Sequence, residues 1–326
     1  MNETRKSVIE QLRQRASSAP KRIVFPESQD PRVVDAALQL QQGSLAHPIL
    51  IQRPGTENTQ LPEGIATVSN SDNTLVERCA TKLFENRKHK GLSPEDAKAA
   101  IHDDSLLFAA TLVALGEADG AVAGSIATTA NVIRAGLHGI GIAPGNKIVS
   151  SFFLMQLPNR CFTYADCGVV PDPNAEQLAE IAIEAARNHN LLSGEKPYVA
   201  MLSFSTKGSA EHQKVDKVRR ALEIVRDQTP DLAIDGELQF DAAWVPNVAA
   251  KKAPNSNVAG NANVFIFPDL DSGNIAYKIT ERLAGATALG PLVQGLANPF
   301  MDLSRGCSVS DIVDVAVVAA ILAKSD

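Results

Sequence analysis

The feature that most constrains the fold of this chain is a repeated alternation of short apolar runs with amphipathic stretches. KRIVFPE (21–27) is a short apolar run typical of a buried strand, and DPRVVDAALQLQQG (30–43) has helical spacing that stops at Gly43. HPILI (47–51) is the next strand-like run. Strands that alternate with helices of this length favour parallel βαβ units. We therefore expect an α/β fold with mainly parallel sheets.

The alternation continues along the rest of the chain. Strand-like runs lie at 118–124, 149–157, 161–170, 197–205, 263–269 and 291–296, and helical stretches lie at 128–140, 174–189, 209–225 and from about 308 onward. A Gly-rich stretch that ends at Leu289 is also expected to be helical. Two stretches rich in Asn, Pro and Gly, 54–73 and 251–263, are expected to be surface loops.

A length of 326 residues fits one large domain or two of ordinary size. The best candidate for a boundary is APGNK (143–147), where Pro and Gly interrupt two strongly patterned segments. The sequence therefore favours two α/β domains.

Charge and composition exclude several classes of protein. The 31 Lys and Arg are outnumbered by 37 Asp and Glu, and aromatic residues make up only 5% of the chain, so a nucleic-acid-binding surface is not expected. No apolar run is long enough to span a membrane, and the N-terminal residues lack the apolar core of a secretory signal. Four scattered cysteines fit a reducing compartment. We expect a cytoplasmic protein without a membrane partner.

The familiar motifs for metals, nucleotides and nucleophilic serines are absent. No C-x-x-C occurs and the six histidines have no metal-type spacing, so no metal is expected. The chain contains neither a P-loop nor a G-x-S-x-G elbow. GIGIAPG (139–145) is Gly-rich, but it follows a helix and lacks the spacing of a dinucleotide fingerprint. No bound cofactor is expected either.

AVAGSIATTANVIRAG (121–136) is the first of three segments that combine small polar residues with a cation. Thr128 and Thr129 stand where a helix should begin, and Arg134 follows about one and a half turns later. Free N–H groups and the positive end of a helix dipole favour an anion at such a place. A simple Thr N-cap with Arg134 in solvent is an equally good interpretation.

The second segment is LSFSTKGSAEH (202–212). Ser205 and Lys207 lie between a strand and a helix that we expect to be capped by Ser209, with His212 in its first turn. Hydroxyls, a glycine and a lysine before a helix suit a phosphate group. An ordinary capped turn explains the same residues.

The third segment, PFMDLSRGCSVSDIVDVAVVAAILA (299–323), places a hydroxyl, a guanidinium and a carboxylate near one helix start. These are Ser304, Arg305 and Asp311. An anionic transition state needs such donors, and an attacking thiol or hydroxyl needs a nearby base. Asp311 also fits a capping box with Ser308, which would be a purely structural role.

These segments, taken together, give the chain a resemblance to the phosphate acetyltransferase family (phosphotransacetylases) over essentially its whole length. The resemblance is carried by several blocks in the same order, which are RIVFPESQDPRVVDAA, TTANVIRAGL with APGNKIVSS, FTYADCGVVPDPNAEQLAEIA, MLSFSTKGSA, DGELQFDAA, ANVFIFPDLDSGNIAYKI and GPLVQGLANPFMDLSRGCSVSDIV. TTANVIRAGL and DGELQFDAAWVP are most similar to the short, ethanolamine-utilisation type. This subgroup raises packaging in a bacterial microcompartment as an alternative to the open cytoplasm.

The resemblance implies a reversible acyltransferase that converts acetyl-CoA and phosphate into acetyl phosphate and CoA, with coenzyme A as a substrate. It implies Ser304 and Arg305 as catalytic residues and Asp311 as the base. Arg87 and Arg134 match the family's two CoA-associated arginines. Met301 departs from the Asn common before Asp-Leu-Ser-Arg in relatives. We expect Met301 to lie in the loop that carries the site, so a change in acyl or phosphate contacts is an open alternative.

The resemblance also implies two α/β domains with an inter-domain cleft, similar to isocitrate and isopropylmalate dehydrogenases, and a homodimer. The first domain would be discontinuous, 1–145 plus 300–326, with the C-terminal site helix, and the second would be 146–299. A propionyl or butyryl phosphate transferase and a non-catalytic acetyl-CoA-sensing module are the alternative functions. Direct attack by the CoA thiol in a ternary complex is the expected mechanism, with a covalent role for Ser304 as its rival.

Overall fold

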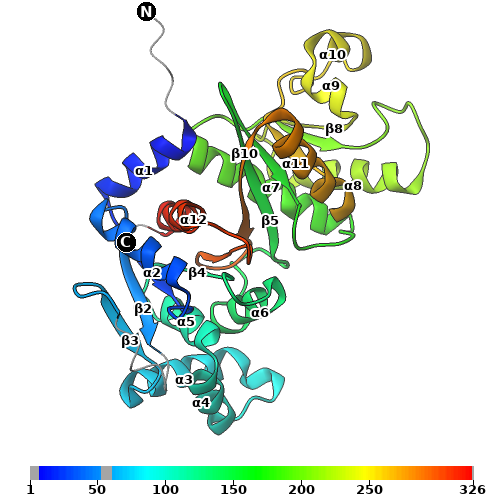
Figure 1. Ribbon diagram of the computed structural model, residues 1–326. Helices are drawn as coiled ribbons and strands as arrows, with labels where there is room; N and C mark the ends of the chain where they lie inside the picture. Colours follow the sequence, from blue (N-terminus) through cyan, green and yellow to red (C-terminus); the bar gives the residue numbers. More distant parts are fainter. Residues whose placement is uncertain (1–6, 53–60, 325–326) are drawn as a thin grey trace, which may run out of the picture. The chain divides into compact units, whose positions relative to one another are not determined.

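The computed structural model describes residues 7–52 and 61–324, which form two compact units (Figure 1). The terminal unit comprises Ile9–Gly145 and Leu296–Asp326, so it draws on both ends of the chain. The middle unit comprises Asn146–Gly295 and also takes in Val8. The chain therefore crosses between the units three times, at Val8/Ile9, at Gly145/Asn146 and at Gly295/Leu296.

The terminal unit is built on a five-stranded sheet in the order β11-β4-β1-β2-β3, in which every neighbouring pair is parallel. Its strands are β1 (Arg22–Phe25), β2 (His47–Gln52), β3 (Ala66–Ser69), β4 (Gly120–Ala123) and β11 (Phe300–Asp302). Its helices are α1 (Val8–Ser18), α2 (Pro31–Gln42), α3 (Asn73–Arg87), the short 3-10 turn η1 (Lys88–Lys90), α4 (Pro94–Asp103), α5 (Ser105–Ala114), α6 (Thr129–Gly139) and α12 (Val309–Leu322).

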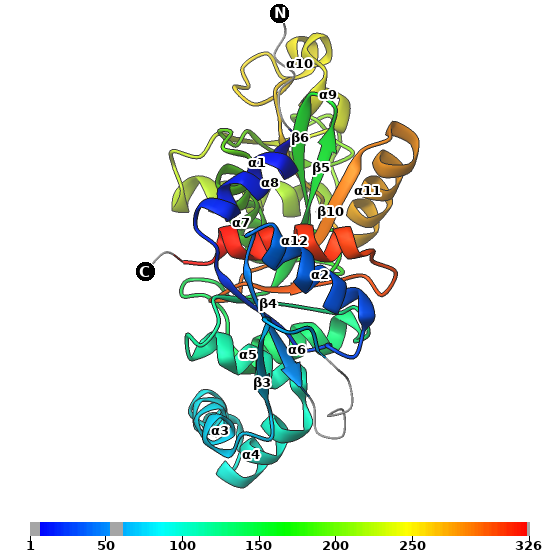
Figure 2. The ribbon, with the colours of Figure 1, turned by 60° about the vertical axis from the view of Figure 1, so that its left-hand side comes forward.

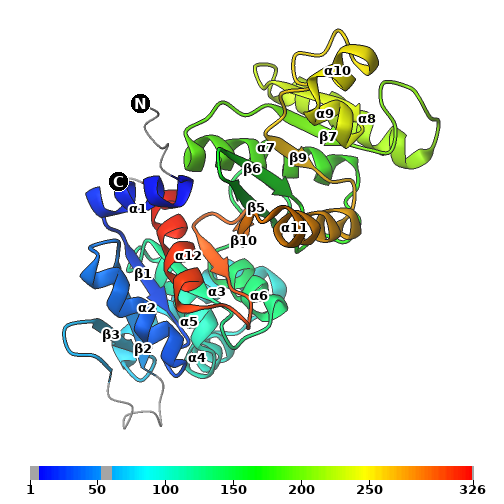
Figure 3. The same ribbon diagram turned by 45° about the horizontal axis from the view of Figure 1, so that its top comes forward.

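Helices cover both faces of this sheet (Figure 3). Val24 of β1 packs in one cluster with residues of α3, α4, α5 and α6, whereas its equally buried neighbours Ile23 and Phe25 lie outside that cluster. Figure 2 shows α2 and α12 next to each other, and α12 packs against both α2 and β1. Successive side chains of a strand point to opposite faces, so Ile23 and Phe25 face the side of these two helices. Burial on both faces is why the strand reads as a continuous apolar run.

The middle unit is built on a six-stranded sheet in the order β10-β5-β6-β9-β7-β8. Its strands are β5 (Ser150–Leu157), β6 (Arg160–Ala165), β7 (Val199–Leu202), β8 (Ile234–Leu238), β9 (Val264–Ile266) and β10 (Thr287–Gln294). Its helices are α7 (Ala175–Ser193), α8 (Gln213–Gln228), α9 (Phe240–Trp244), α10 (Pro246–Lys252) and α11 (Leu270–Ala284). β5 pairs antiparallel with β6 and β10, and the other pairs are parallel. The expected α/β fold with mainly parallel sheets is confirmed.

Several helix starts lie where the sequence predicts them, because a short polar side chain caps each one. Asp30 accepts a hydrogen bond from Arg32 N and Pro31 is the first residue of α2. Thr128 caps α6, and Ser308 with Asp311 forms a capping box on α12.

Four local predictions were wrong. α8 is capped by His212 rather than Ser209, through a hydrogen bond from Lys214 N to His212 Nδ1. α11 ends at Ala284, because Gly285 adopts a left-handed conformation (φ 66°), and Leu289 already belongs to β10. Part of 54–73 is the strand β3, although 53–60 lie outside the described residues.

The fourth wrong prediction concerns the position of Met301. It does not lie in a loop that could contact a ligand, because it pairs with Val122 inside the parallel sheet and is only 1% exposed.

Candidate functional site

Ser304 and Arg305 lie in the loop between β11 and α12 of the terminal unit, and both are exposed. Ser304 Oγ accepts a hydrogen bond of 3.3 Å from Gly306 N, a geometry that leaves the hydroxyl proton available to a ligand. The Arg305 guanidinium has no partner among the described residues. A hydroxyl donor and an unpaired cation thus stand side by side on one loop, which we call the site loop (303–307).

Asp311 lies in the first turn of α12, and its carboxylate closes the capping box. Its Oδ2 accepts a hydrogen bond of 2.8 Å from Ser308 N, while Asp311 N donates to Ser308 Oγ at 3.2 Å. Asp311 is exposed, and Oδ1 is left without a protein donor among the described residues. The structural role is therefore real, and one carboxylate oxygen is still free to accept a proton.

Arg32, which the sequence analysis did not single out, holds the site loop in place. Its guanidinium donates to the carbonyl oxygens of Arg305 (3.0 Å), Cys307 (2.7 Å) and Ser125 (3.0 Å), and it pairs with Asp30 at 2.7 Å. The five donors of a guanidinium allow such a fixed, forked arrangement. Its partners at the loop lie some 270 residues away in the sequence, so no local pattern could have found this role.

The turn at the end of β4 already contains an anion, the carboxylate of Glu27. Its Oε2 accepts hydrogen bonds from Gly124 N (2.7 Å) and Ser125 N (2.8 Å), and its Oε1 accepts from Ile126 N (3.1 Å) and Ala127 N (2.7 Å). These four N–H groups belong to the turn before α6 and not to the helix start at Thr128 and Thr129, where the sequence predicts free N–H groups. The protein fills this backbone nest with its own side chain.

Thr129 joins the start of α6 to the end of β11. Its hydroxyl donates a hydrogen bond of 2.6 Å to Asp302 Oδ2, and Asp302 directly precedes the site loop. Asp302 is 1% exposed, and its Oδ1 has no hydrogen-bonding partner within the described part of the chain. Burial, together with the nearby charge of Glu27, raises the pKa of Asp302 to about 6, although the hydrogen bond from Thr129 acts against the rise.

Asp302→Asn is expected to stabilise the protein at neutral pH. Because the pKa of Asp302 is higher in the folded protein than the ordinary value of 3.8, the wild type loses stability as the pH rises from about 4 to 6. Asparagine can accept the Thr129 hydrogen bond without the buried charge. Urea unfolding should show a gain of about 1–3 kcal/mol at pH 7.5 and none at pH 4.

The matched control for this pH effect is Asp119→Asn. Asp119 pairs with Arg22 at 2.7 Å, and despite partial burial its hydrogen bonds with Arg22 lower its pKa. Its replacement should therefore destabilise the protein at pH 7.5, the opposite sign. An equal effect of Asp302→Asn at both pH values would contradict the assignment of a buried charge to Asp302.

Arg87 and Arg134 are brought together in the terminal unit. Arg87 is the last residue of α3, whose end is joined to α6 by a hydrogen bond of 2.9 Å from Asn86 Nδ2 to Gly139 O. Arg134 lies on α6, one turn before His138. Both guanidiniums act electrostatically on His138, so the two cations share one small region of the surface.

Arg87, Arg134 and Arg305 differ from the other arginines that the structure describes. Each of the others has an interaction partner. For most of them this partner is an acidic side chain, and for Arg160 it is the ring of Trp244. Within residues 7–52 and 61–324, the guanidiniums of these three have none. Unpaired cations are available to anionic ligands without first breaking an ion pair.

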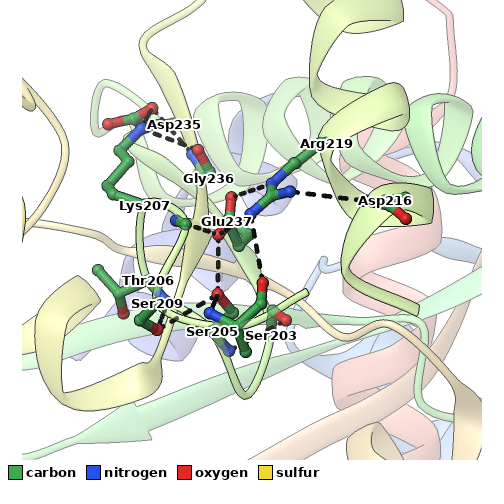
Figure 4. A network of polar contacts seen from close by, with 12 residues as sticks. Ser203, Ser205, Thr206, Lys207, Ser209, Asp216, Arg219, Asp235, Gly236 and Glu237 are labelled. Atoms are coloured by element: carbon green, nitrogen blue, oxygen red, sulfur yellow. Dashed lines mark hydrogen bonds and ion pairs between the residues drawn. The ribbon is translucent and has the colours of Figure 1, made fainter. Parts of the chain in front are cut away.

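Ser205 and Lys207, in contrast, belong to an internal network of the middle unit (Figure 4). Ser205 is fully buried, and its hydroxyl donates to Glu237 Oε1 at 2.9 Å. Lys207 Nζ pairs with Asp235 at 2.5 Å and donates to Gly236 O. Both side chains therefore already have protein partners that organise the loop.

The same network holds Glu237 as an anion. Burial acts to raise the pKa of Glu237, but hydrogen bonds from Arg219, Gly208 N and Ser205 outweigh it and lower the pKa to about 2. Arg219 Nε lies 3.0 Å from Glu237 Oε2, which makes a salt bridge with one well-buried partner. Figure 4 shows Glu237 between this guanidinium and the serines of the loop. The arrangement fixes the backbone of 203–209.

No group of three or more His, Cys, Asp or Glu side chains in the described residues is arranged to hold a metal ion. Nor does any helix in the described part of the chain have the length and apolar character needed to cross a membrane.

Comparison with known proteins gives a consistent result. A family model described as "Phosphate acetyl/butaryl transferase" matches residues 7–320. The phosphate acetyltransferase of Acetivibrio thermocellus is 48% identical, with 98% of each chain covered. That of Thermoanaerobacterium thermosaccharolyticum is 47% identical over 98% of this chain and 100% of its own.

Solved structures agree with this result. A phosphotransacetylase from Streptococcus pyogenes superposes with a TM-score of 0.90 at 42% identity, covering 97% of this chain and 98% of its own. The EutD phosphotransacetylase from Staphylococcus aureus has a TM-score of 0.89 at 37% identity, covering 98% and 100%. Both matches extend over the two units described above.

Proposed function

The chain belongs to the phosphate acetyl/butaryl transferase family and is a phosphate acetyltransferase, and from this premise we propose that acetyl transfer between coenzyme A and phosphate takes place at the site loop. One observation carries this proposal. Among the described arginines, three have guanidiniums without a partner, and these are Arg305 in the site loop and the neighbouring pair Arg87 and Arg134. The substrates are polyanions, and these are the cations free to bind them.

The proposed reaction is a direct displacement in a ternary complex. The thiol sulfur of CoA forms a bond to the carbonyl carbon of acetyl phosphate, the bond from that carbon to the phosphate oxygen breaks, and phosphate leaves. The thiol proton passes to a base, for which we propose the free oxygen of Asp311. Ser304 would donate a hydrogen bond to the carbonyl oxygen as negative charge develops there, and Arg305 would bind the phosphate oxygens.

The timing of the proton transfer follows from magnitudes. An ordinary carboxylate is about four to five pKa units more acidic than a thiol, so complete deprotonation before attack would cost about 6 kcal/mol. Proton transfer that accompanies formation of the C–S bond avoids this cost. The base therefore also has to orient the thiol.

The remaining predicted residues have more distant roles. We propose that Arg87 and Arg134 pair with phosphates of CoA, and that Thr128 and Thr129 support them by fixing the start of α6. The protein partners of Ser205 and Lys207 support a role in shaping the loop 203–209 rather than direct contact with the substrate.

The test of the function is an assay of acetyl-CoA formation from acetyl phosphate and CoA, with propionyl and butyryl phosphate measured alongside. We expect turnover with acetyl phosphate and lower kcat/KM for the longer chains. Equal or higher kcat/KM for butyryl phosphate would favour the alternative acyl preference. CoA binding without any turnover would favour the non-catalytic sensing module.

We further propose that the protein is a homodimer, because α11 exposes an apolar stripe. Ile275, Ile279 and Leu283 lie at i, i+4 and i+8 on one face and are 57%, 52% and 83% exposed. Water-exposed apolar side chains in a row favour contact with another surface, and a two-fold axis would let the stripe meet its own copy.

Ile279→Arg is expected to convert the dimer into a monomer in size-exclusion chromatography with light scattering, because it places a charge in the centre of the stripe. Glu223→Arg, on the exposed side of α8, is the matched control and should leave the mass unchanged. A wild-type protein with the mass of one chain would contradict the proposal.

A reducing compartment such as the cytoplasm is also proposed. All four cysteines, Cys79, Cys161, Cys167 and Cys307, are buried free thiols. Burial raises the pKa of both Cys79 and Cys161 to about 12, so these thiols are poorly reactive toward oxidants.

A further inference from the structure

His138 lies within the surface region that holds Arg87 and Arg134. His138 and Arg134 are four residues apart on α6, so they project from the same face of the helix. The hydrogen bond from Asn86 to Gly139 joins the residue next to Arg87 to the residue next to His138. The imidazole of His138 is half-buried and has no hydrogen-bonding partner among the described residues.

The charges that act on this imidazole are positive. α3, which packs against α6, also carries Glu77, Arg78, Lys82 and Glu85, but Arg87 is the residue of this helix that acts on His138. Burial and then the charges of Arg87 and Arg134 lower the pKa of His138. α5, which packs against α6, carries no ionisable side chain. β11 also packs against α6, but its Asp302 is bonded to Thr129, at the opposite end of the helix from His138. η1, which follows Arg87, adds only basic residues.

We infer that His138 is a third group that binds a phosphate of CoA, and that it takes up a proton as the phosphate binds. This inference rests on the proposed CoA site at Arg87 and Arg134. A phosphate placed between the two guanidiniums cancels their repulsion on the imidazole, and the imidazolium then becomes a further N–H donor to the phosphate oxygens. The lowered pKa of His138 disfavours the charged imidazole in the free protein, so the third positive charge is favoured only once a phosphate is bound.

The sign of the pH dependence follows from linkage. If binding raises the pKa of His138, the affinity for CoA must increase as the pH falls through the pKa of the bound state, by about tenfold for each unit of the rise. At a pH above both pKa values the imidazole is neutral in both states and adds no charge. The terminal phosphate of CoA itself titrates near pH 6 and has the opposite effect, because its protonation weakens pairing with arginine. The informative quantity is therefore the difference in CoA affinity between the wild type and a His138 variant at each pH.

The experiment is calorimetric titration of CoA into the full-length protein, without acetyl phosphate, at pH 6 and pH 8. Two buffers with different ionisation enthalpies give the number of protons taken up. His138→Gln keeps a polar side chain of similar reach that cannot be charged, and His138→Lys keeps a permanent charge. His102→Gln, on exposed α4, is the matched control and should behave as the wild type.

We expect His138→Gln to bind CoA about tenfold more weakly than the wild type at pH 6 and less than twofold more weakly at pH 8. Its proton uptake should be smaller by up to one proton. His138→Lys should bind CoA at least as tightly as the wild type at pH 8. Equal losses for His138→Gln at both pH values, with unchanged proton uptake, would overturn the inference.

A comparison of CoA with dephospho-CoA identifies which phosphate His138 binds. Dephospho-CoA retains the pyrophosphate but lacks the terminal phosphomonoester. If the pH-dependent difference disappears with dephospho-CoA, His138 binds the terminal phosphate, and if it persists, His138 binds the pyrophosphate. If the wild type turns over acetyl phosphate and binds CoA, and the His138 variants bind CoA with the same affinity and pH dependence, only the role of His138 is refuted. A wild type that does not bind CoA refutes the proposed function.

Discussion

Arg305→Lys is expected to reduce turnover almost as much as Arg305→Ala does, by about 10²–10³-fold in kcat. A guanidinium can bind two phosphate oxygens with parallel hydrogen bonds, whereas an ammonium is a point charge that cannot reproduce this geometry. The structure supports a functional role because the Arg305 side chain has no partner within the described residues. The substitution should therefore cost little stability.

Steady-state kinetics and a thermal melt together test this prediction. Both Arg305 variants should melt within a few degrees of the wild type and bind CoA normally. Arg282→Lys, at an exposed arginine on α11 that pairs with Glu281, is the matched control and should retain full kcat. Wild-type kcat in Arg305→Lys would refute bidentate binding by the guanidinium.

Asp311→Asn is expected to lower kcat by about 10²–10⁴-fold, the range typical of losing a general base. Asparagine is nearly isosteric, and its side-chain oxygen can still accept the hydrogen bond from Ser308 N, so the capping box persists. The variant removes the basic carboxylate and leaves the start of α12 intact. Single-turnover kinetics at saturating CoA measure the chemical step directly.

Ser308→Ala is the control that separates the two roles of Asp311. It removes the hydroxyl that accepts from Asp311 N, and should cost about 0.5–2 kcal/mol of stability while leaving the carboxylate in place. We expect Ser308→Ala to be less stable but nearly as active as the wild type, and Asp311→Asn to be as stable as the wild type but to have the much lower kcat given above. Similar kcat values for Asp311→Asn and the wild type would leave Asp311 with its capping role alone.

Local rules explain why so much of the fold could be predicted. The starts of α2, α6 and α12 depend on a polar cap and the residues within one turn of it, so a window of a few residues contains all the necessary information. The end of α11 and the start of β10 were misjudged because helical spacing before Leu289 outweighed Gly285, where the helix ends. β3 was missed because four small residues at the edge of a sheet carry almost no pattern.

The candidate site, like the fold, could be predicted from the sequence only in part. The resemblance to a family identified Ser304, Arg305 and Asp311, and the structure adds the partners that no short window contains. Lys207 looks as available as Arg305 in the sequence, yet Asp235, 28 residues later, pairs with it. The backbone donors around 124–127 look free until Glu27, about a hundred residues earlier, fills them. Whether a charged side chain or a backbone donor is free to bind a ligand therefore depends on residues that are distant in the sequence and close only in the folded protein.

The most direct test of the proposed reaction is the exchange of radioactive phosphate into acetyl phosphate, measured with and without CoA. Direct attack by the CoA thiol predicts that exchange occurs only when CoA is present, because the acetyl group has no other acceptor. Wild-type protein and Ser304→Ala should both show no exchange without CoA. Rapid exchange by the wild type in the absence of CoA, abolished by Ser304→Ala, would show an acetyl group on Ser304 and contradict transfer in a ternary complex.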